Sequence, residues 1–146
     1  MGIKKDHGAY FETVIEQCGL TTQNTVIVLA ITSSYVKYND ALIRGFSNYR
    51  QRGYQIALRF DHLISDKHAA ELIFKLTPDF VSLSARQIEI ANGSNALTKL
   101  HLLKRIISTT SSKGILRQID RKKSEILARQ SGFDFVEGSY YERTLN

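Results

Sequence analysis

Short apolar runs and longer amphipathic segments alternate along the chain. Residues 25–31 form a run rich in β-branched side chains, with the length and composition of a buried strand. Similar short runs predict four more strands, at 54–60, 80–84, 115–119 and 133–136. The sequence therefore predicts five strands separated by segments of different periodicity.

The segments between these strands have the spacing of helices. We expect helices at about 10–18, 40–52, 65–76 and 122–130, with a longer one between the polar stretch 92–95 and a loop at 108–114. In the third of these helices the inward positions are Ala69, Leu72, Ile73 and Leu76. Pro78 follows this helix, and Gly132 follows the last one, as expected for helix ends.

Alternating strands and helices predict an α/β fold with parallel strands joined by right-handed helical crossovers. Five strands fit either an open doubly wound sheet or part of a (β/α)8 barrel. A whole barrel normally needs about 250 residues, and this sequence has 146. Without a linker or repeat, the chain 1–146 is predicted to be one domain, with 1–8 as a flexible N-terminal segment.

The composition is that of a soluble globular protein, with 42% hydrophobic and 23% charged residues. The longest apolar run, 26–31, is far shorter than the roughly 20 residues of a membrane span. A single cysteine, Cys18, excludes an internal disulfide and a Cys-rich zinc site. We expect a cytoplasmic domain with no membrane contact and no cofactor.

Basic residues are concentrated in the second half of the chain. Residues 1–73 hold 8 basic and 7 acidic side chains, whereas residues 74–146 hold 12 and 7. This half includes the run Arg121-Lys122-Lys123. A basic surface attracts nucleic acid, but the sequence has no recognised nucleic-acid motif and solvated surfaces are often charged. Nucleic-acid binding therefore stays an alternative function.

Charged side chains follow the predicted strands at the edge where parallel α/β proteins carry their chemistry. Arg59, Arg86 and Arg117 lie at or just beyond three strand ends. Such arginines suit an anion: a phosphate, a nucleotide or an acidic loop of a partner. The simpler alternative is that they pair with Asp61, Asp120 and Glu137.

The order of these strands, and the residues around them, resembles the C-terminal part of EAL domains, bacterial cyclic-di-GMP phosphodiesterases with a modified (β/α)8 barrel. The family segments EITES, ALDDFG, IKID, AEGVE and QGY correspond here to residues 30–34, 57–62, 81–84, 116–120 and 137–139. The resemblance spans about residues 10–141. It implies a fold of about five strands from such a barrel.

Most of the charged groups that this family uses are replaced. Ala30 stands at the metal-binding glutamate, Ser82 and Ser84 at the lysine and aspartate of IKID, and Arg117 at the first glutamate of AEGVE. The aspartate pair corresponds either to Arg59 and Phe60 or to Asp61 and His62, while Asp120 keeps the second acid of AEGVE. The EAL tripeptide itself is not in the sequence.

These replacements remove oxygen ligands and add positive charge where two divalent metals would bind. We therefore expect no metal site and no phosphodiester hydrolysis. Asp61, His62 and Asp120 are the residual candidates for weak metal binding. The alternative is that Asp61 and His62 are groups of a loop and a helix start.

The resemblance implies a non-enzymatic regulatory module that binds a protein partner in cyclic-di-GMP-related signalling. Cyclic-di-GMP is expected to bind weakly or not at all, because the EAL strand is missing. An open array of strands also predicts a homodimer that covers the edge strand of Val26, Val28 and Leu29. In the monomeric alternative, the helix at 10–18 folds over that edge.

Overall fold

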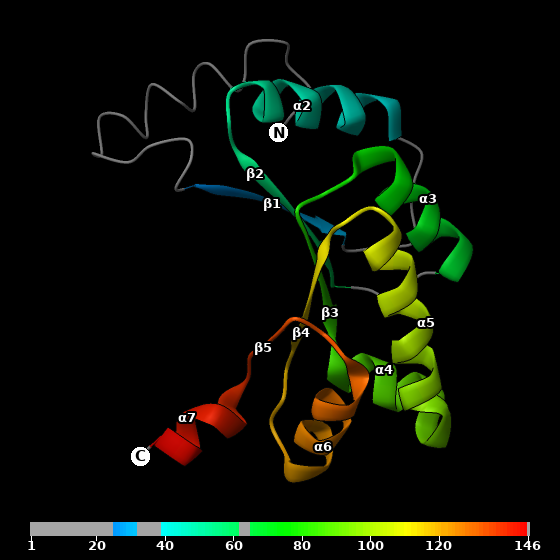
Figure 1. The fold of residues 1–146 in the computed structure, drawn as a ribbon, viewed down its shortest axis with the longest axis vertical. Helices are drawn as coiled ribbons and strands as arrows, with labels where there is room; N and C mark the ends of the chain where they lie inside the picture. Colours follow the sequence, from blue (N-terminus) through cyan, green and yellow to red (C-terminus); the bar gives the residue numbers. More distant parts are fainter. Residues whose placement is uncertain (1–24, 32–38, 62–64, 146) are drawn as a thin grey trace.

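The computed structural model describes residues 25–31, 39–61 and 65–145 (Figure 1). The strands are β1 (Val26–Ile31), β2 (Gln55–Phe60), β3 (Phe80–Ser84), β4 (Lys113–Arg117) and β5 (Phe135–Val136). The helices are α2 (Asn39–Gln51), α3 (Asp66–Leu76), α4 (Ala85–Asn92), α5 (Ala96–Thr109), α6 (Lys122–Ser131) and α7 (Ser139–Leu145), with a 3₁₀ turn, η2 (Gly93–Asn95). The predicted segment 1–8 and helix 10–18 lie outside the described residues.

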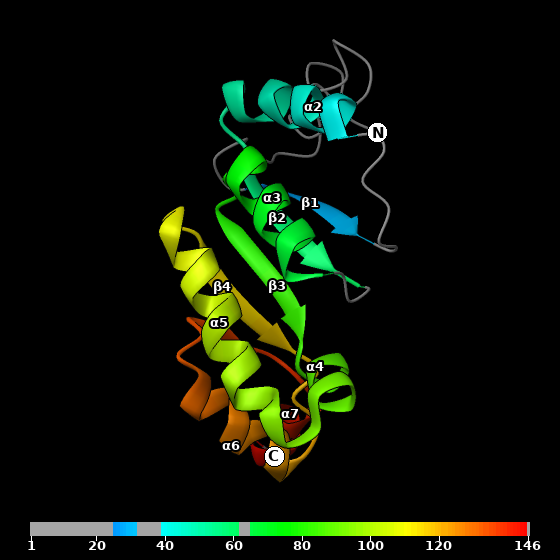
Figure 2. The same ribbon diagram turned by 90° about the vertical axis from the view of Figure 1, so that its right-hand side faces the viewer.

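The five strands form one parallel sheet in the order β1-β2-β3-β4-β5. Each strand is thus the neighbour of the next one in the chain, without the reversal that defines a doubly wound sheet. Figures 1 and 2 show α3, α4 and α5 on the same face of the sheet. The α/β prediction is confirmed, and of the two architectures the structure has the barrel type.

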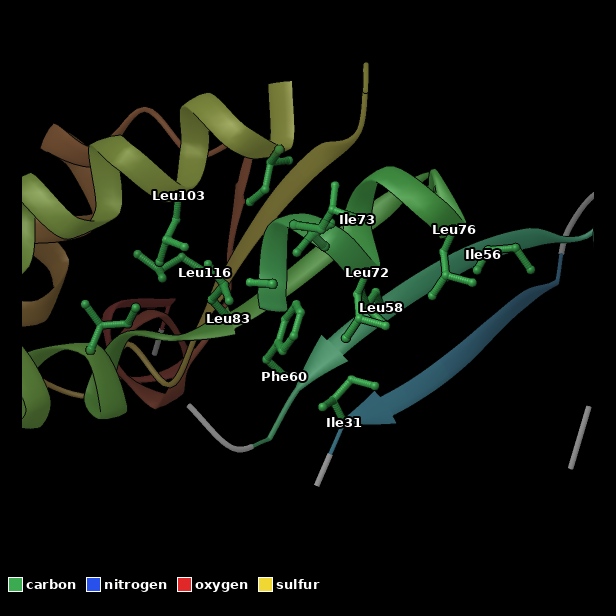
Figure 3. Packing of buried hydrophobic residues seen from close by; sticks show 14 of the residues in the cluster. Ile31, Ile56, Leu58, Phe60, Leu72, Ile73, Leu76, Leu83, Leu103 and Leu116 are labelled. Atoms are coloured by element: carbon green, nitrogen blue, oxygen red, sulfur yellow. The ribbon is translucent and has the colours of Figure 1, made fainter. Parts of the chain in front are cut away.

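The hydrophobic core lies between the sheet and these helices. Ile56, Leu58 and Phe60 alternate along β2 and point to the helical side, where α3 presents its apolar face (Figure 3). All four inward positions predicted for this helix are buried. Burying one such side chain contributes about 1.5–3 kcal/mol, so this interface fixes which face of the sheet the helices cover.

The opposite face of the sheet is turned away from α3, α4 and α5. The strand register places on it, from β1 to β5, Val26, Val28, Ala30, Gln55, Ala57, Arg59, Phe80, Ser82, Ser84, Lys113, Ile115, Arg117 and Phe135. We call these residues the open face. Val28 is 49% exposed and Phe135 is 52% exposed, so part of this apolar surface is accessible in the described portion of the chain.

Local signals explain why the ends of α3 were predictable. The Ser65 hydroxyl accepts a hydrogen bond from the His68 amide at 3.2 Å and caps the helix start. At the other end, Thr77 adopts the left-handed conformation with φ 41°, and Pro78 follows. Arg50 donates to the carbonyl oxygen of Thr77 at 2.7 Å and to its hydroxyl at 3.0 Å, which holds this strained turn.

Several predictions along the chain were wrong, among them the fifth strand, which covers only Phe135–Val136 rather than 133–136. The fourth strand lies at Lys113–Arg117 rather than 115–119, because Gln118 leaves the strand with a φ of 63°. The loop expected at 108–114 is shorter, since α5 continues to Thr109. Helices α4 and α7 were not predicted; α4 buries only Ala85 and Ile88 and begins directly at the end of β3.

Among the described residues, no helix is long and apolar enough to cross a membrane.

Candidate functional site

The candidate site lies on the open face, where β2, β3 and β4 end. The register pairs Arg59 of β2 with Ser82 of β3, and Ser84 of β3 with Arg117 of β4. Asp61 follows β2 directly. Parallel strands thus bring together side chains that are far apart in the sequence, as expected for this edge of the sheet.

Asp61 lies between two guanidinium groups. Arg59 makes a bidentate pair with it, from Nε to Oδ1 at 2.9 Å and from Nη2 to Oδ2 at 2.9 Å. Arg117 Nη2 contacts the same Oδ1 at 3.1 Å. Forked pairs of this kind are the geometry that arginine favours with carboxylates and phosphates. Asp61 therefore occupies the place of an anion between the two arginines.

Arg117 is the more deeply held of the two arginines. Its side chain is 13% exposed, and it donates to the Phe60 carbonyl oxygen at 2.6 Å and to the Ser82 hydroxyl at 3.1 Å. Burial lowers the pKa of Arg117, whereas the hydrogen bond to Asp61 raises the pKa of Arg59. Both guanidinium groups stay charged at neutral pH. The single negative charge of Asp61 neutralises one of them, so these three side chains keep one net positive charge.

Neighbouring polar groups tie this cluster to α4. The Ser84 hydroxyl bonds the Gln118 side chain and accepts a hydrogen bond from the Gln87 amide at 3.2 Å. The Gln87 side chain donates to the Asp61 carbonyl oxygen at 2.8 Å. Neither glutamine was predicted from the sequence as a site residue. The spacing of Ser84 and Gln87 is that of a helix cap and its third residue, and this signal would have identified Gln87.

The three arginines proposed as one anion site are divided by the fold. Arg59 and Arg117 meet at Asp61, whereas Arg86 belongs to α4 and lines a separate cavity. Asp120 lies in that second region and accepts hydrogen bonds from the Ser139 amide at 3.3 Å and hydroxyl at 2.9 Å. The negative charge of Glu137 stabilises the charged forms of Arg59 and Arg117 at longer range.

Two of the three residual metal candidates are bonded to other protein groups. Asp61 is engaged by two arginines and Asp120 by Ser139, and His62 lies outside the described residues. Among residues 25–31, 39–61 and 65–145, the structure contains no group of three or more His, Cys, Asp or Glu side chains placed to hold a metal ion.

No protein-family model matches the sequence, and no curated protein matches it. Solved structures do match, at low sequence identity. The Bacillus subtilis protein YkuI, with an EAL domain and in complex with substrate cyclic-di-GMP and calcium, gives a TM-score of 0.74 at 18% identity over 93% of this chain and 34% of that one. The chain has the fold of part of an EAL domain.

Two further structures agree. Klebsiella pneumoniae BlrP1, in a manganese and cyclic-di-GMP complex, gives a TM-score of 0.75 at 13% identity over 92% of this chain and 34% of that chain. The EAL enzyme Bd1971, bound to cAMP and cyclic-di-GMP, gives 0.76 at 15% identity over 94% and 36%. This chain therefore spans about a third of the length of these proteins.

Two backbone features fit the correspondence between this chain and the EAL motifs. Gln118, which stands at the glycine of AEGVE, has a φ of 63°, in the region that glycine favours. Gly138 stands at the glycine of QGY, where a Cβ atom would lie 2.2 Å from the Ile119 carbonyl oxygen. The close approach of these two turns explains the glycine at 138.

Proposed function

We propose that this chain is a non-hydrolytic EAL-like module that binds a protein partner in cyclic-di-GMP-related signalling. The observation that carries the proposal is the pairing of Asp61 with both Arg59 and Arg117. The Asp61 carboxylate, at the edge of the sheet where the strands end, is thereby bonded to two arginines of the same chain. Ser82 and Ser84, the register partners of Arg59 and Arg117, supply hydroxyl groups rather than carboxylates.

Hydrolysis of cyclic-di-GMP by two metals needs several oxygen ligands close together. YkuI holds calcium and BlrP1 manganese together with cyclic-di-GMP. In this chain two guanidinium groups lie at the corresponding edge of the sheet, and like charge repels a divalent cation. These features support a domain that keeps the fold of EAL domains and lacks their chemistry.

The open face supports a role in binding. Val26 is 40% exposed, Val28 is 49% exposed and Phe135 is 52% exposed. Phe135 also lies against Phe80, with ring centroids 6.3 Å apart. These side chains lie on one face at the two outer strands, β1 and β5. Exposed apolar side chains on such a face support binding to another protein.

Two other functions have weaker support. Residual binding of cyclic-di-GMP or another anionic nucleotide requires Arg59 and Arg117 to give up their bonds to Asp61 and bind the nucleotide instead. Nucleic-acid binding needs a free basic surface, but Arg121 lies 3.8 Å from Glu89, and Lys122 lies 3.9 Å from Glu125 and over the Tyr140 ring. The basic run is thus partly neutralised by its neighbours.

A hydrolysis assay tests the catalytic half of this proposal. We expect no conversion of cyclic-di-GMP above a protein-free control with Mg²⁺ or Mn²⁺. The reason is that Arg59 and Arg117 lie at the strand ends where the two metal ions would have to bind. An active EAL phosphodiesterase assayed in parallel is the positive control. Turnover that a chelator abolishes contradicts the proposal.

A second copy of the chain is the simplest protein partner for the open face. Light scattering in dilute solution is expected to show a dimer of the 16.6 kDa chain, and Val28→Lys is expected to convert it into a folded monomer. Phe74→Lys is the matched control, because Phe74 is 51% exposed on the helical side. A wild-type chain that stays monomeric at high micromolar concentration and unfolds cooperatively rules out the dimer.

A further inference from the structure

Helices α4 and α6 lie close together and leave a groove between them (Figure 1). The Ser124 hydroxyl of α6 donates to Glu89 Oε2 of α4 at 2.8 Å and joins the two helices. A hollow of about 440 Å³ lies toward the start of α4, and a second one of about 380 Å³ lies toward its end. Glu89 lines both hollows, so they are two parts of one surface, which we call the α4–α6 groove.

Each hollow presents an exposed isoleucine. Ile90 lines the first hollow and is 76% exposed, and Ile126 lines the second and is 42% exposed. Leu97 and Leu127, both half-buried, extend the apolar lining of the second hollow. Exposed apolar side chains beside a hollow are a feature of surfaces on which another molecule docks.

The charges that reach solvent beside these isoleucines are positive. Arg86 lines the first hollow and Lys123 the second, and both are exposed. Neither of them forms an ion pair within 4.0 Å in the part of the chain that the structure describes. The start of α6 adds Arg121 and Lys122, whose side chains are each 65% exposed. The amides of its first turn add further positive potential.

The two acidic side chains that line the groove are engaged within the protein. Glu89 is 9% exposed, and its Oε2 is held by Ser124 and lies 3.8 Å from Arg121 Nη2. Asp120 accepts hydrogen bonds from the Ser139 amide at 3.3 Å and hydroxyl at 2.9 Å. A partner in the groove therefore meets apolar side chains with a positively charged border.

We propose that the α4–α6 groove binds an acidic amphipathic helix of a partner protein. Apolar side chains of that helix contact Ile90 and Ile126, and aspartate or glutamate side chains beside them pair with Arg86 and Lys123. This inference rests on the proposed function, because it takes the partner to be a protein, and it assigns that partner a surface and a chemistry.

Shape and charge together select this class of partner. The lining comes from helices and the turns next to them, and among the described residues no strand lines the groove. An extended peptide therefore finds no strand edge to pair with, whereas an apolar helix face commonly docks in such a groove. A nucleic acid meets the positive border but has no apolar side chains to cover the isoleucines. A basic helix meets like charge.

Selection of binders from a display library of random peptides, with the full chain as the target, tests this inference. We expect the enriched peptides to be acidic and to carry large apolar residues three or four positions apart, as on one face of a helix. The most enriched peptide, made synthetically, is expected to bind in calorimetry with a Kd below roughly 100 μM. Added salt should weaken this binding, and replacing its acidic residues by lysine should abolish it.

Variants then locate the site. Ile90→Ser and Lys123→Gln, one in each hollow, are each expected to weaken binding of that synthetic peptide about tenfold or more. Phe74→Ser and Lys67→Gln are the matched controls, because both residues are exposed on α3, and they should leave binding unchanged. Circular dichroism and thermal melting show whether each variant is folded.

The inference is overturned if no peptide is enriched, if the enriched peptides are basic, or if both groove variants bind the synthetic peptide like the wild type. Binding that is lost in Val28→Lys and kept in the groove variants places the peptide on the open face. That result overturns the groove as the docking site and leaves the proposed function standing.

Discussion

Gly138→Ala is expected to destabilise the protein severely, by about 3 kcal/mol or more. A Cβ atom at this position would lie 2.2 Å from the carbonyl oxygen of Ile119 and 2.3 Å from its amide nitrogen. Both groups are bonded across the same turn, the amide to the Glu137 carbonyl at 3.1 Å and the carbonyl to the Tyr140 amide at 3.0 Å. No side-chain rotation relieves a clash between Cβ and backbone, so β5 and α7 must move away from β4.

Urea unfolding and amide hydrogen exchange measure this effect. The free energy of unfolding is expected to fall, and the amides of Ile119 and Tyr140 are expected to lose protection before those of β2. Gly132→Ala is the matched control: Gly132 adopts the left-handed conformation with a φ of 80°, but a Cβ atom there has nothing within 4 Å. Its cost is limited to about 1 kcal/mol of backbone strain. Equal losses in the two variants contradict the steric explanation.

The parts of the fold that the sequence predicted well are those fixed by local physical chemistry. The strand 80–84 and the helix that follows Ser65 are set by apolar periodicity, a hydroxyl cap and a proline. The structure confirms both. The predicted end of β4 lies two residues too late. The chain turns at Gln118, which has a left-handed backbone, and glutamine is not a residue type from which a turn is predicted.

The arrangement of the site depends on contacts that periodicity does not encode. Arg117 and Asp61 are 56 residues apart and meet only because β2 and β4 flank β3 on its two sides in the sheet. Arg86 also follows a strand end, but α4 begins at Ala85, so Arg86 already lies on a helix. A residue just beyond a strand therefore belongs to the site at this edge only when the chain there continues as a loop rather than as a helix.

Asp61→Asn is expected to convert the cluster of Asp61, Arg59 and Arg117 into an anion site. The wild-type carboxylate holds the place between Arg59 and Arg117 at 2.9 and 3.1 Å. Asparagine keeps the shape and removes the charge, so two guanidinium groups face each other without an anion. We expect the variant to bind pyrophosphate and cyclic-di-GMP at least about tenfold more tightly than the wild type at low salt, with an affinity that falls as salt is added.

The same substitution is expected to lower stability by about 1–3 kcal/mol without added anion, because Arg117, 13% exposed, loses a charged partner. Added pyrophosphate should restore part of this loss by mass action. Asp66→Asn is the matched control, since it makes the same change in net charge at the Lys99 pair on the helical side. If Asp61→Asn binds these anions no better than Asp66→Asn does, the arginines only fasten β2 to β4. Tighter binding that disappears in Asp61→Asn with Arg117→Met assigns the gained site to this cluster.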